Sequence, residues 1–219
     1  GFGVKLIVVA CNSATAAALK EAQERYAEIP IVGVVMPGVH GALRATSSGR
    51  IGVIGTKLTI ESGVYQEAIL KREPGFKVFG RACPEFVEFV ERGEVTGDRV
   101  AGVVRKYIEP LMDLGIDALI MGCTHYPLLE PLLRRVAGPE VALISSAEET
   151  AGEVREILED FGWLAPGGSG RRFFLTTGDA RKCVVLGRRF LGPEVRGVVP
   201  VDFDSYPELG LQLPGGAKH

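Results

Sequence analysis

The chain has 219 residues, of which 46% are hydrophobic, so it is long enough to bury a core and to form one or two domains. Its 25 basic and 27 acidic residues leave a net charge of −2, which argues against a nucleic-acid partner and against a disordered acidic tail. Its apolar runs are too short to span a bilayer and no signal peptide is recognisable at its start, so we expect no membrane partner.

Apolar, β-branched runs alternate with segments of helical period, which is typical of βα units around a mostly parallel sheet. The predicted strands, in chain order, are Val4–Ala10, Ile31–Val35, Ile51–Gly55, Lys77–Ala82, Asp117–Met121, Val141–Ile144, Phe173–Thr176 and Arg196–Val201. The predicted helices are Ser13–Ala27, Val39–Thr46, Thr59–Lys71, Glu85–Glu91, Asp98–Leu114, Leu128–Val136, Ala147–Phe161 and Ala180–Leu191. Turn residues separate these elements: Pro30 precedes a strand, Pro37-Gly38 follow one, and Gly138-Pro139 close a helix.

Two similar segments of the chain carry a cysteine at the same place. GVKLIVVACNSATAAAL starts at Gly3 and GIDALIMGCTHYPLLEPLL starts at Gly115, so Cys11 and Cys123 occupy equivalent positions. A thiol at equivalent ends of two similar half-structures predicts two matched acid/base groups that face one site.

Both cysteines follow a predicted strand and precede a predicted helix. A buried structural role is the ordinary interpretation of a lone cysteine. Ligands of open α/β sheets, however, gather beyond the carboxyl ends of strands, and the N-terminus of a following helix favours a thiolate. Cys11 and Cys123 are therefore predicted to be functional. Cys83 and Cys183 are predicted to be structural, and the four cysteines together favour a reduced, cytoplasmic protein because their spacing fits neither zinc nor a disulfide framework.

Small polar residues accompany both thiols. Asn12 and Ser13 follow the first thiol, and Thr124 and His125 follow the second. Such side chains, together with N–H groups at a helix start, can hold carboxylates, although helix capping also explains Asn12 and Ser13. His125 is placed to tune or relay the proton of Cys123.

Thr56 directly follows another predicted strand, and Thr59 comes one turn later at the start of the next helix. Both threonines could cap this helix or bind a ligand. His40 and the terminal His219 belong to no cluster of ligating residues, so no metal site is expected.

The motifs VACNSATA around Cys11, VIGTKLTI around Thr56, RACPEFVEFVERG around Cys83 and MGCTHYPLL around Cys123 resemble those of bacterial glutamate racemases, in the same order. The resemblance implies a racemase of the aspartate/glutamate racemase superfamily that uses no cofactor. It also implies an α/β fold of two similar parallel-sheet domains related by pseudo-symmetry. Residues 1–36 would be the remainder of the first domain, residues 37–146 the second domain, and residues 147–219 a return to the first.

The resemblance also implies roles for single residues. Cys11 and Cys123 would be the two catalytic acid/base groups, and His125 and Glu91 would assist at the second thiol. The implied substrate contacts are Asn12, Ser13, Thr56, Thr59, Thr124 and His125. Aspartate racemases generally carry an acidic residue where this chain has His125, which favours glutamate as the substrate.

By the same resemblance the small-molecule partner is glutamate, and the product D-glutamate serves peptidoglycan synthesis, cell-wall biogenesis and cell shape in the cytoplasm. A homodimer is left open.

The front of the chain departs from the family pattern. The family's Asp-Ser-Gly motif and Pro-Tyr-Gly loop have no counterpart in this sequence. We therefore expect a first domain that is incomplete at its N-terminus and a strand Val4–Ala10 with exposed hydrophobic edges. One expectation is that this chain alone has no racemase activity.

Three alternatives follow. The chain could be an inactive fragment or partner-binding remnant of the family, or an aspartate or related racemase. It could also be a thiol hydrolase with Cys123 as nucleophile and His125 as base, but that scheme leaves Cys11 unexplained and offers no third group to orient the histidine.

Overall fold

A computed structural model describes residues 3–168 and 170–202 of the chain. Val4–Leu164 form one compact unit, and Gly3 belongs with the described residues from Ala165 onward to a second. The domain limits 1–36, 37–146 and 147–219 stay a prediction. His219 lies outside the described residues.

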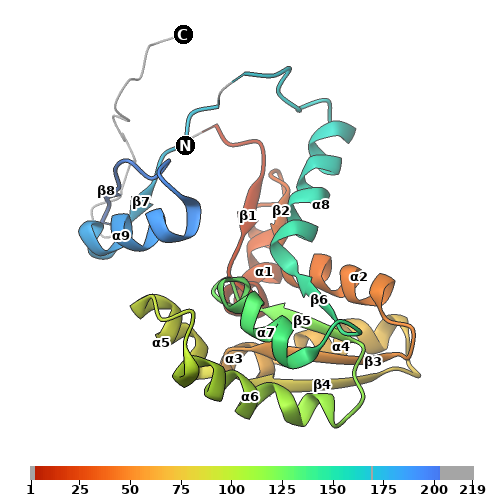
Figure 1. Cartoon of the computed structure of the whole chain (residues 1–219). Helices are drawn as coiled ribbons and strands as arrows, with labels where there is room; N and C mark the ends of the chain where they lie inside the picture. The colour runs from red at the N-terminus through yellow and green to blue at the C-terminus, as the bar shows by residue number, and fades with distance from the viewer. Residues whose placement is uncertain (1–2, 169, 203–219) are drawn as a thin grey trace. The chain divides into compact units, whose positions relative to one another are not determined.

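A parallel four-stranded sheet forms the centre of the larger unit (Figure 1). Its strands lie in the order β4 (Lys77–Ala82), β3 (Arg50–Gly55), β5 (Ala118–Gly122) and β6 (Ala142–Ser145). The two central strands are apolar along nearly their whole length because helices cover both faces of the sheet (Figure 1). These four predicted strands are confirmed, and so is the mixed α/β class with parallel pairing.

The two faces of the sheet pack against different sets of helices. On one face, Ile51 and Val53 of β3 pack with residues of α2 (Val35–Ala45) and α4 (Val64–Arg72). On the other face, Gly52 leaves room for Ile116 and Leu119, since a Cβ at Gly52 would lie 2.5 Å from Ile116 Cδ1. Helices α5 (Pro84–Arg92), α6 (Asp98–Met112) and α7 (Glu130–Ala137) complete this part of the unit.

A second parallel pair of strands carries the first cysteine segment. β1 (Ile7–Val9) pairs with β2 (Ile31–Gly33), and α1 (Asn12–Arg25) connects them. Strand β2 is buried, whereas Ile7 and Val8 of β1 are 36% and 39% exposed. The expected exposure of hydrophobic residues on this strand is confirmed. The chain leaves β6 through α8 (Ser146–Asp160), which contacts α2 and β2.

The smaller unit contains a parallel pair, β7 (Leu175–Thr176) and β8 (Val199–Pro200), joined through α9 (Ala180–Leu191). Asp179 begins α9 by accepting hydrogen bonds from the N–H groups of Arg181 and Lys182. Both strands are shorter than predicted. Their residues are exposed or half-buried, so few packing contacts stabilise a longer strand.

Two predicted boundaries are wrong for identifiable reasons. The predicted helix Thr59–Lys71 is two helices, α3 (Lys57–Glu61) and α4, because Gly63 adopts a positive φ of 69° that a right-handed helix cannot continue. Helix α2 begins at Val35, so Pro37-Gly38 lie in its first turn and do not follow a strand. The first turn tolerates proline because its N–H would have no partner within the helix.

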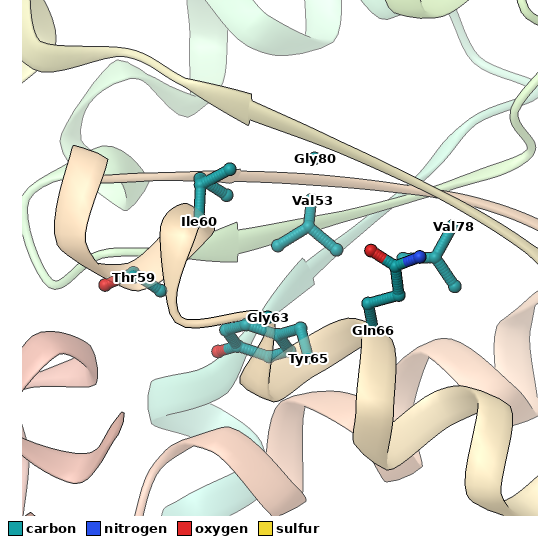
Figure 2. Close-up of a pocket in the computed structure, with 8 residues that line it drawn as sticks. All are labelled: Val53, Thr59, Ile60, Gly63, Tyr65, Gln66, Val78 and Gly80. Carbon is teal, nitrogen blue, oxygen red and sulfur yellow. The ribbon is translucent and has the colours of Figure 1, made fainter. Parts of the chain in front are cut away.

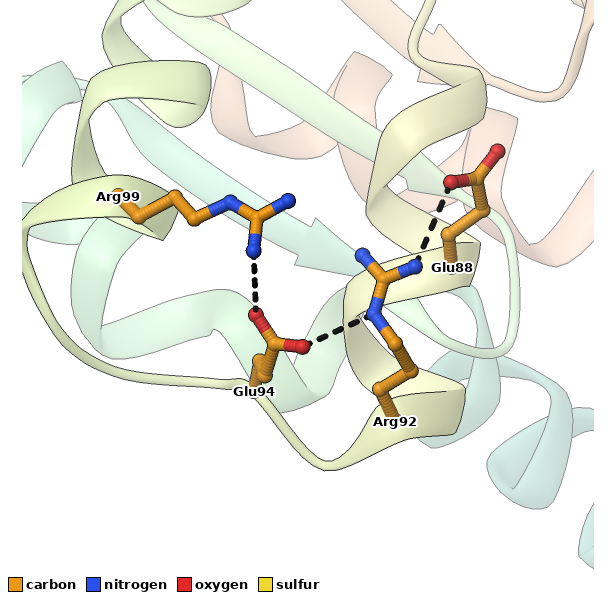
Figure 3. Close-up of polar contacts among 4 residues, drawn as sticks. All are labelled: Glu88, Arg92, Glu94 and Arg99. Atoms are coloured by element: carbon orange, nitrogen blue, oxygen red, sulfur yellow. Dashed lines mark hydrogen bonds and ion pairs between the residues drawn. The ribbon is translucent and has the colours of Figure 1, made fainter.

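Exposed ion pairs connect the end of α5 to the loop before α6 (Figure 3). Arg92 lies 3.6 Å from Glu88 and 2.9 Å from Glu94, and Glu94 also pairs with Arg99 at 3.7 Å. Surface pairs of this kind contribute at most about 1 kcal/mol each. They lie at the end of the helix that carries Glu91.

The buried thiol of Cys83 makes stability depend on alkaline pH. Cys83 is fully buried, and burial raises its pKa from 9.0 to about 12. In the unfolded chain the thiol loses its proton first, so its stabilising contribution is complete below pH 9 and is lost as the pH rises toward 12.

We predict that the free energy of unfolding falls between pH 9 and 12 and that Cys83→Ala flattens this decrease by up to about 1.4 kcal/mol per pH unit. Denaturant titrations at several pH values measure the slope. Cys183→Ala, at a half-buried thiol, is the control and should leave the slope unchanged. An unaltered slope in Cys83→Ala would contradict the prediction.

Candidate active site

Cys11 stands at the junction between β1 and α1. It is exposed and occupies the N-cap position of the helix with an extended backbone, but its side chain makes no capping hydrogen bond. The capping interpretation of Asn12 and Ser13 is therefore wrong, because both residues lie inside the first turn of α1.

Three hydroxyl groups from distant parts of the sequence meet beside this helix start. Ser13 Oγ lies 2.8 Å from Thr56 Oγ1 and 3.1 Å from Thr59 Oγ1, and the two threonine oxygens are 3.1 Å apart. Thr56 also caps α3 by accepting the N–H of Thr59, so its capping interpretation is confirmed. The cluster can present several hydroxyl donors to one anionic group.

Cys123 follows the last residue of β5 and is 7% exposed. Burial raises its pKa; the charge of Cys11 acts in the same direction, whereas the N–H groups of His125 and Tyr126 and the side chain of Thr124 oppose it. The expected lowering of the pKa at a helix start is wrong for Cys123, because burial outweighs the surrounding donors.

His125 lies between the buried thiol and a carboxylate. Its Nδ1 is 3.7 Å from Cys123 Sγ and 3.4 Å from Thr124 Oγ1, and its Nε2 is 3.8 Å from Glu91 Oε1. Glu91 comes from the last turn of α5, more than thirty residues earlier in the chain. The sequence offered no third group to orient His125 in a hydrolase, and the structure places Glu91 at that position.

Tyr65 also belongs to this region and was missed by the sequence interpretation. It is buried on α4, and its hydroxyl donates a 2.6 Å hydrogen bond to Oδ1 of Asn12. The sequence did contain a signal for Tyr65, namely a tyrosine on the apolar face of a predicted helix. A buried phenol hydroxyl requires a hydrogen-bond partner, so such a tyrosine indicates a polar contact in the interior.

Two cavities lie near these residues. One of about 350 Å³ reaches Cys123 and Thr124 from the side of Ala10 and is also lined by α8 residues that include Ser146 and Thr150. The other, about 160 Å³, is lined by apolar residues such as Val53 and Ile60 and also by Thr59, Tyr65 and Gln66. Figure 2 shows the hydroxyl groups of Thr59 and Tyr65 directed to the side away from Gln66 and Val78. Of these two cavities, the first is the one that Cys123 lines.

Within the part of the chain that the structure describes, no three His, Cys, Asp or Glu side chains group closely enough to hold a metal ion. No helix in that part has the length and apolar character needed to cross a membrane.

Residues 2–154 match the Asp/Glu/Hydantoin racemase family. The chain belongs to this family. Family membership confirms the prediction of an amino-acid racemase, which is an isomerase.

Glutamate racemases are among the curated relatives of this family member. The protein of Mycobacterium ulcerans is 48% identical over 203 residues, which is 92% of this chain and 74% of the relative. The protein of Mycobacterium leprae is 47% identical over 209 residues, 94% of this chain and 75% of the relative.

Solved structures of the family share the fold. Glutamate racemase isoform RacE1 from Bacillus anthracis superposes with a TM-score of 0.87 at 42% identity, over 92% of this chain and 75% of that one. Glutamate racemase from Francisella tularensis in complex with D-glutamate superposes with a TM-score of 0.85 at 32% identity, over 93% and 75%. The predicted fold class is confirmed by these superpositions.

The glycine before Cys123 is required by close packing. A Cβ at Gly122 would lie 2.9 Å from the carbonyl oxygen of Ile54, a rigid backbone atom, and 3.1 Å from Cε2 of Tyr65. We predict that Gly122→Ala destabilises the fold by about 1–3 kcal/mol, because either strand β3 or the ring of Tyr65 must shift to make room for the methyl group.

The control is Gly102→Ala in α6, where an added Cβ would meet nothing within 4 Å. Removing a helical glycine there should stabilise by up to about 1 kcal/mol. Chemical denaturation measures both variants, and equal stabilities would refute the packing argument.

Proposed function

We propose that the protein interconverts L-glutamate and D-glutamate with Cys11 and Cys123 as the paired acid and base. The observation that carries the proposal is the cavity that extends from Ala10, the neighbour of Cys11, to Cys123 and Thr124. Family membership and the names of the relatives support glutamate as the substrate.

Racemisation removes the α-hydrogen from one face of the substrate and returns a proton to the other. The two thiols must then differ in protonation, one being a thiolate and the other a thiol. Burial favours the neutral form of Cys123, so Cys123 is the proton donor in one direction and Cys11 the base. The reverse direction starts from the opposite protonation state, so the pair titrates as one coupled system.

The hydroxyl cluster of Ser13, Thr56 and Thr59 is proposed to bind a substrate carboxylate, with the amide of Asn12 nearby on the same helix. Donors that are fixed before the reaction stabilise negative charge without reorganising, and a single donor of this kind is typically worth about 3 kcal/mol. The contacts between the three hydroxyl groups keep them in place.

His125 and Glu91 are proposed to assist only at Cys123. The carboxylate of Glu91 can orient the ring and stabilise its positive charge, and the ring can exchange a proton with the thiol 3.7 Å away.

D-Glutamate formed in this way would supply peptidoglycan synthesis. The four free cysteines fit the reducing conditions of the cytoplasm. A measurement of the molecular mass in solution tests whether the protein assembles as a homodimer.

We predict that Cys11→Ala and Cys123→Ala each reduce racemisation about 10²–10⁴-fold or more in both directions, because each removes one of two proton-transfer groups. Incorporation of solvent deuterium at the α-position of L- and D-glutamate measures the effect. Cys183→Ala, which alters neither of the two proposed thiols, is the control and should keep full exchange.

Near-normal exchange in either of the two site variants would remove the paired-thiol mechanism. If the unaltered protein exchanges no deuterium, the proposal of a partner-binding remnant is favoured.

We predict that His125→Asn slows the two directions unequally, because His125 contacts Cys123 and acts on one thiol of the pair. Initial rates from L-glutamate and from D-glutamate give the ratio, and Glu91→Gln should change it in the same sense. Equal losses in both directions would assign His125 to substrate binding.

A thiol hydrolase is the second candidate, because Cys123, His125 and Glu91 form a thiol–imidazole–carboxylate series. Incubation with an activated glutamate ester distinguishes the two functions. A hydrolase accumulates a thioester on Cys123, whereas a racemase instead exchanges deuterium into free glutamate.

A further inference from the structure

Asn12 holds a polar atom whose position calls for a ligand. The residue is 2% exposed, and its Nδ2 is the one buried side-chain nitrogen or oxygen of the described residues that has no hydrogen-bond partner. Buried N–H groups without partners are unfavourable and uncommon in folded proteins. A carboxylate that accepts from Nδ2 would remove this penalty.

The orientation of the Asn12 amide is set by Tyr65. The phenol hydroxyl donates its only proton to Oδ1 of Asn12 at 2.6 Å. Turning the amide over would put its NH₂ group in place of Oδ1, and an NH₂ group cannot accept the phenol proton. Tyr65 therefore keeps the two N–H donors of Asn12 on the opposite side.

Tyr65 is itself held firmly. A Cβ at Gly122 would lie 3.1 Å from its ring, and a Cβ at Gly38 would lie 3.4 Å from its hydroxyl and 3.3 Å from Cβ of Ser146. The ring packs in the core with Val53 and Ile69, and it also lines the smaller cavity (Figure 2). Burial raises the pKa of Tyr65, so the hydroxyl keeps its proton and stays a donor.

We propose that Tyr65 is a positioning residue, which fixes the amide of Asn12 so that its N–H groups point to the substrate and bind a carboxylate of glutamate. This inference rests on the proposed function. Tyr65 lies on α4 and packs against β3 and β5, whereas Asn12 is the first residue of α1, directly after Cys11. The hydrogen bond therefore connects the four-stranded sheet and its helices to the start of α1.

The test compares Tyr65→Phe with Tyr107→Phe. Tyr107 is the matched control because its hydroxyl also donates to an acceptor, Glu85, from a mostly buried ring, but on α6. We predict that Tyr65→Phe raises KM for both enantiomers about tenfold and changes kcat less than about threefold, because the carboxylate contact is made in the substrate complex and the transition state alike. Tyr107→Phe should change neither constant.

A double-mutant cycle separates positioning from general stability. If Tyr65 acts through Asn12, Tyr65→Phe adds less than about a twofold effect in an Asn12→Ala background. Asn12→Asp provides a second variant, which keeps an acceptor for the Tyr65 hydroxyl but replaces the N–H donors; it should raise KM at least as much as Asn12→Ala.

Titration calorimetry with D-glutamate compares the same variants by their Kd values and does not depend on turnover. Equal KM and Kd in Tyr65→Phe and Tyr107→Phe, or multiplicative effects in the cycle, overturn the role of Tyr65 while leaving the racemase intact. D-Glutamate binding without deuterium exchange overturns the proposed function, and the Kd values then decide on Tyr65. A protein that neither binds nor exchanges overturns both.

Discussion

The parallel register of β3 and β5 is the constraint on which the site depends. Gly55 and Gly122 are direct partners at the carboxyl ends of these strands, so Thr56 and Cys123 leave the sheet at the same edge. Both glycine positions are closely packed: a Cβ at Gly55 would meet the side chain of Thr59 at 3.3 Å, and one at Gly122 would meet the Ile54 carbonyl at 2.9 Å. The close approach of β3 and β5 thereby sets the separation of the groups that follow them.

The site consists of two polar systems that differ in exposure. The hydroxyl cluster around Ser13 is part-buried and formed from helix starts, where unpaired N–H groups are also available. The Cys123–His125–Glu91 series begins at a buried sulfur and ends at a partly exposed carboxylate. An environment that is apolar at one end and solvated at the other suits a proton that must leave a neutral thiol and return to it.

Much of the fold was predictable, because buried parallel strands have a simple signature. The runs IGVIG and ALIMG are apolar on both faces, and both proved to be central strands. Helix limits were less predictable where one residue overrides the pattern, as the positive φ of Gly63 does between α3 and α4. The direction of the Cys123 pKa could not be predicted either, since the balance of burial against N–H donors depends on atoms from several segments.

By itself the sequence determined the alternating α/β order, the equivalence of Cys11 and Cys123, and the polar residues beside each thiol, because these properties depend on periodicity and local neighbours. The tertiary structure alone decided which groups meet: Ser13 with Thr56, His125 with Glu91, and Tyr65 with Asn12. Each of these pairs joins segments more than thirty residues apart. Local pattern carries no information on such distances, which are fixed only when strands pair and helices pack on the sheet.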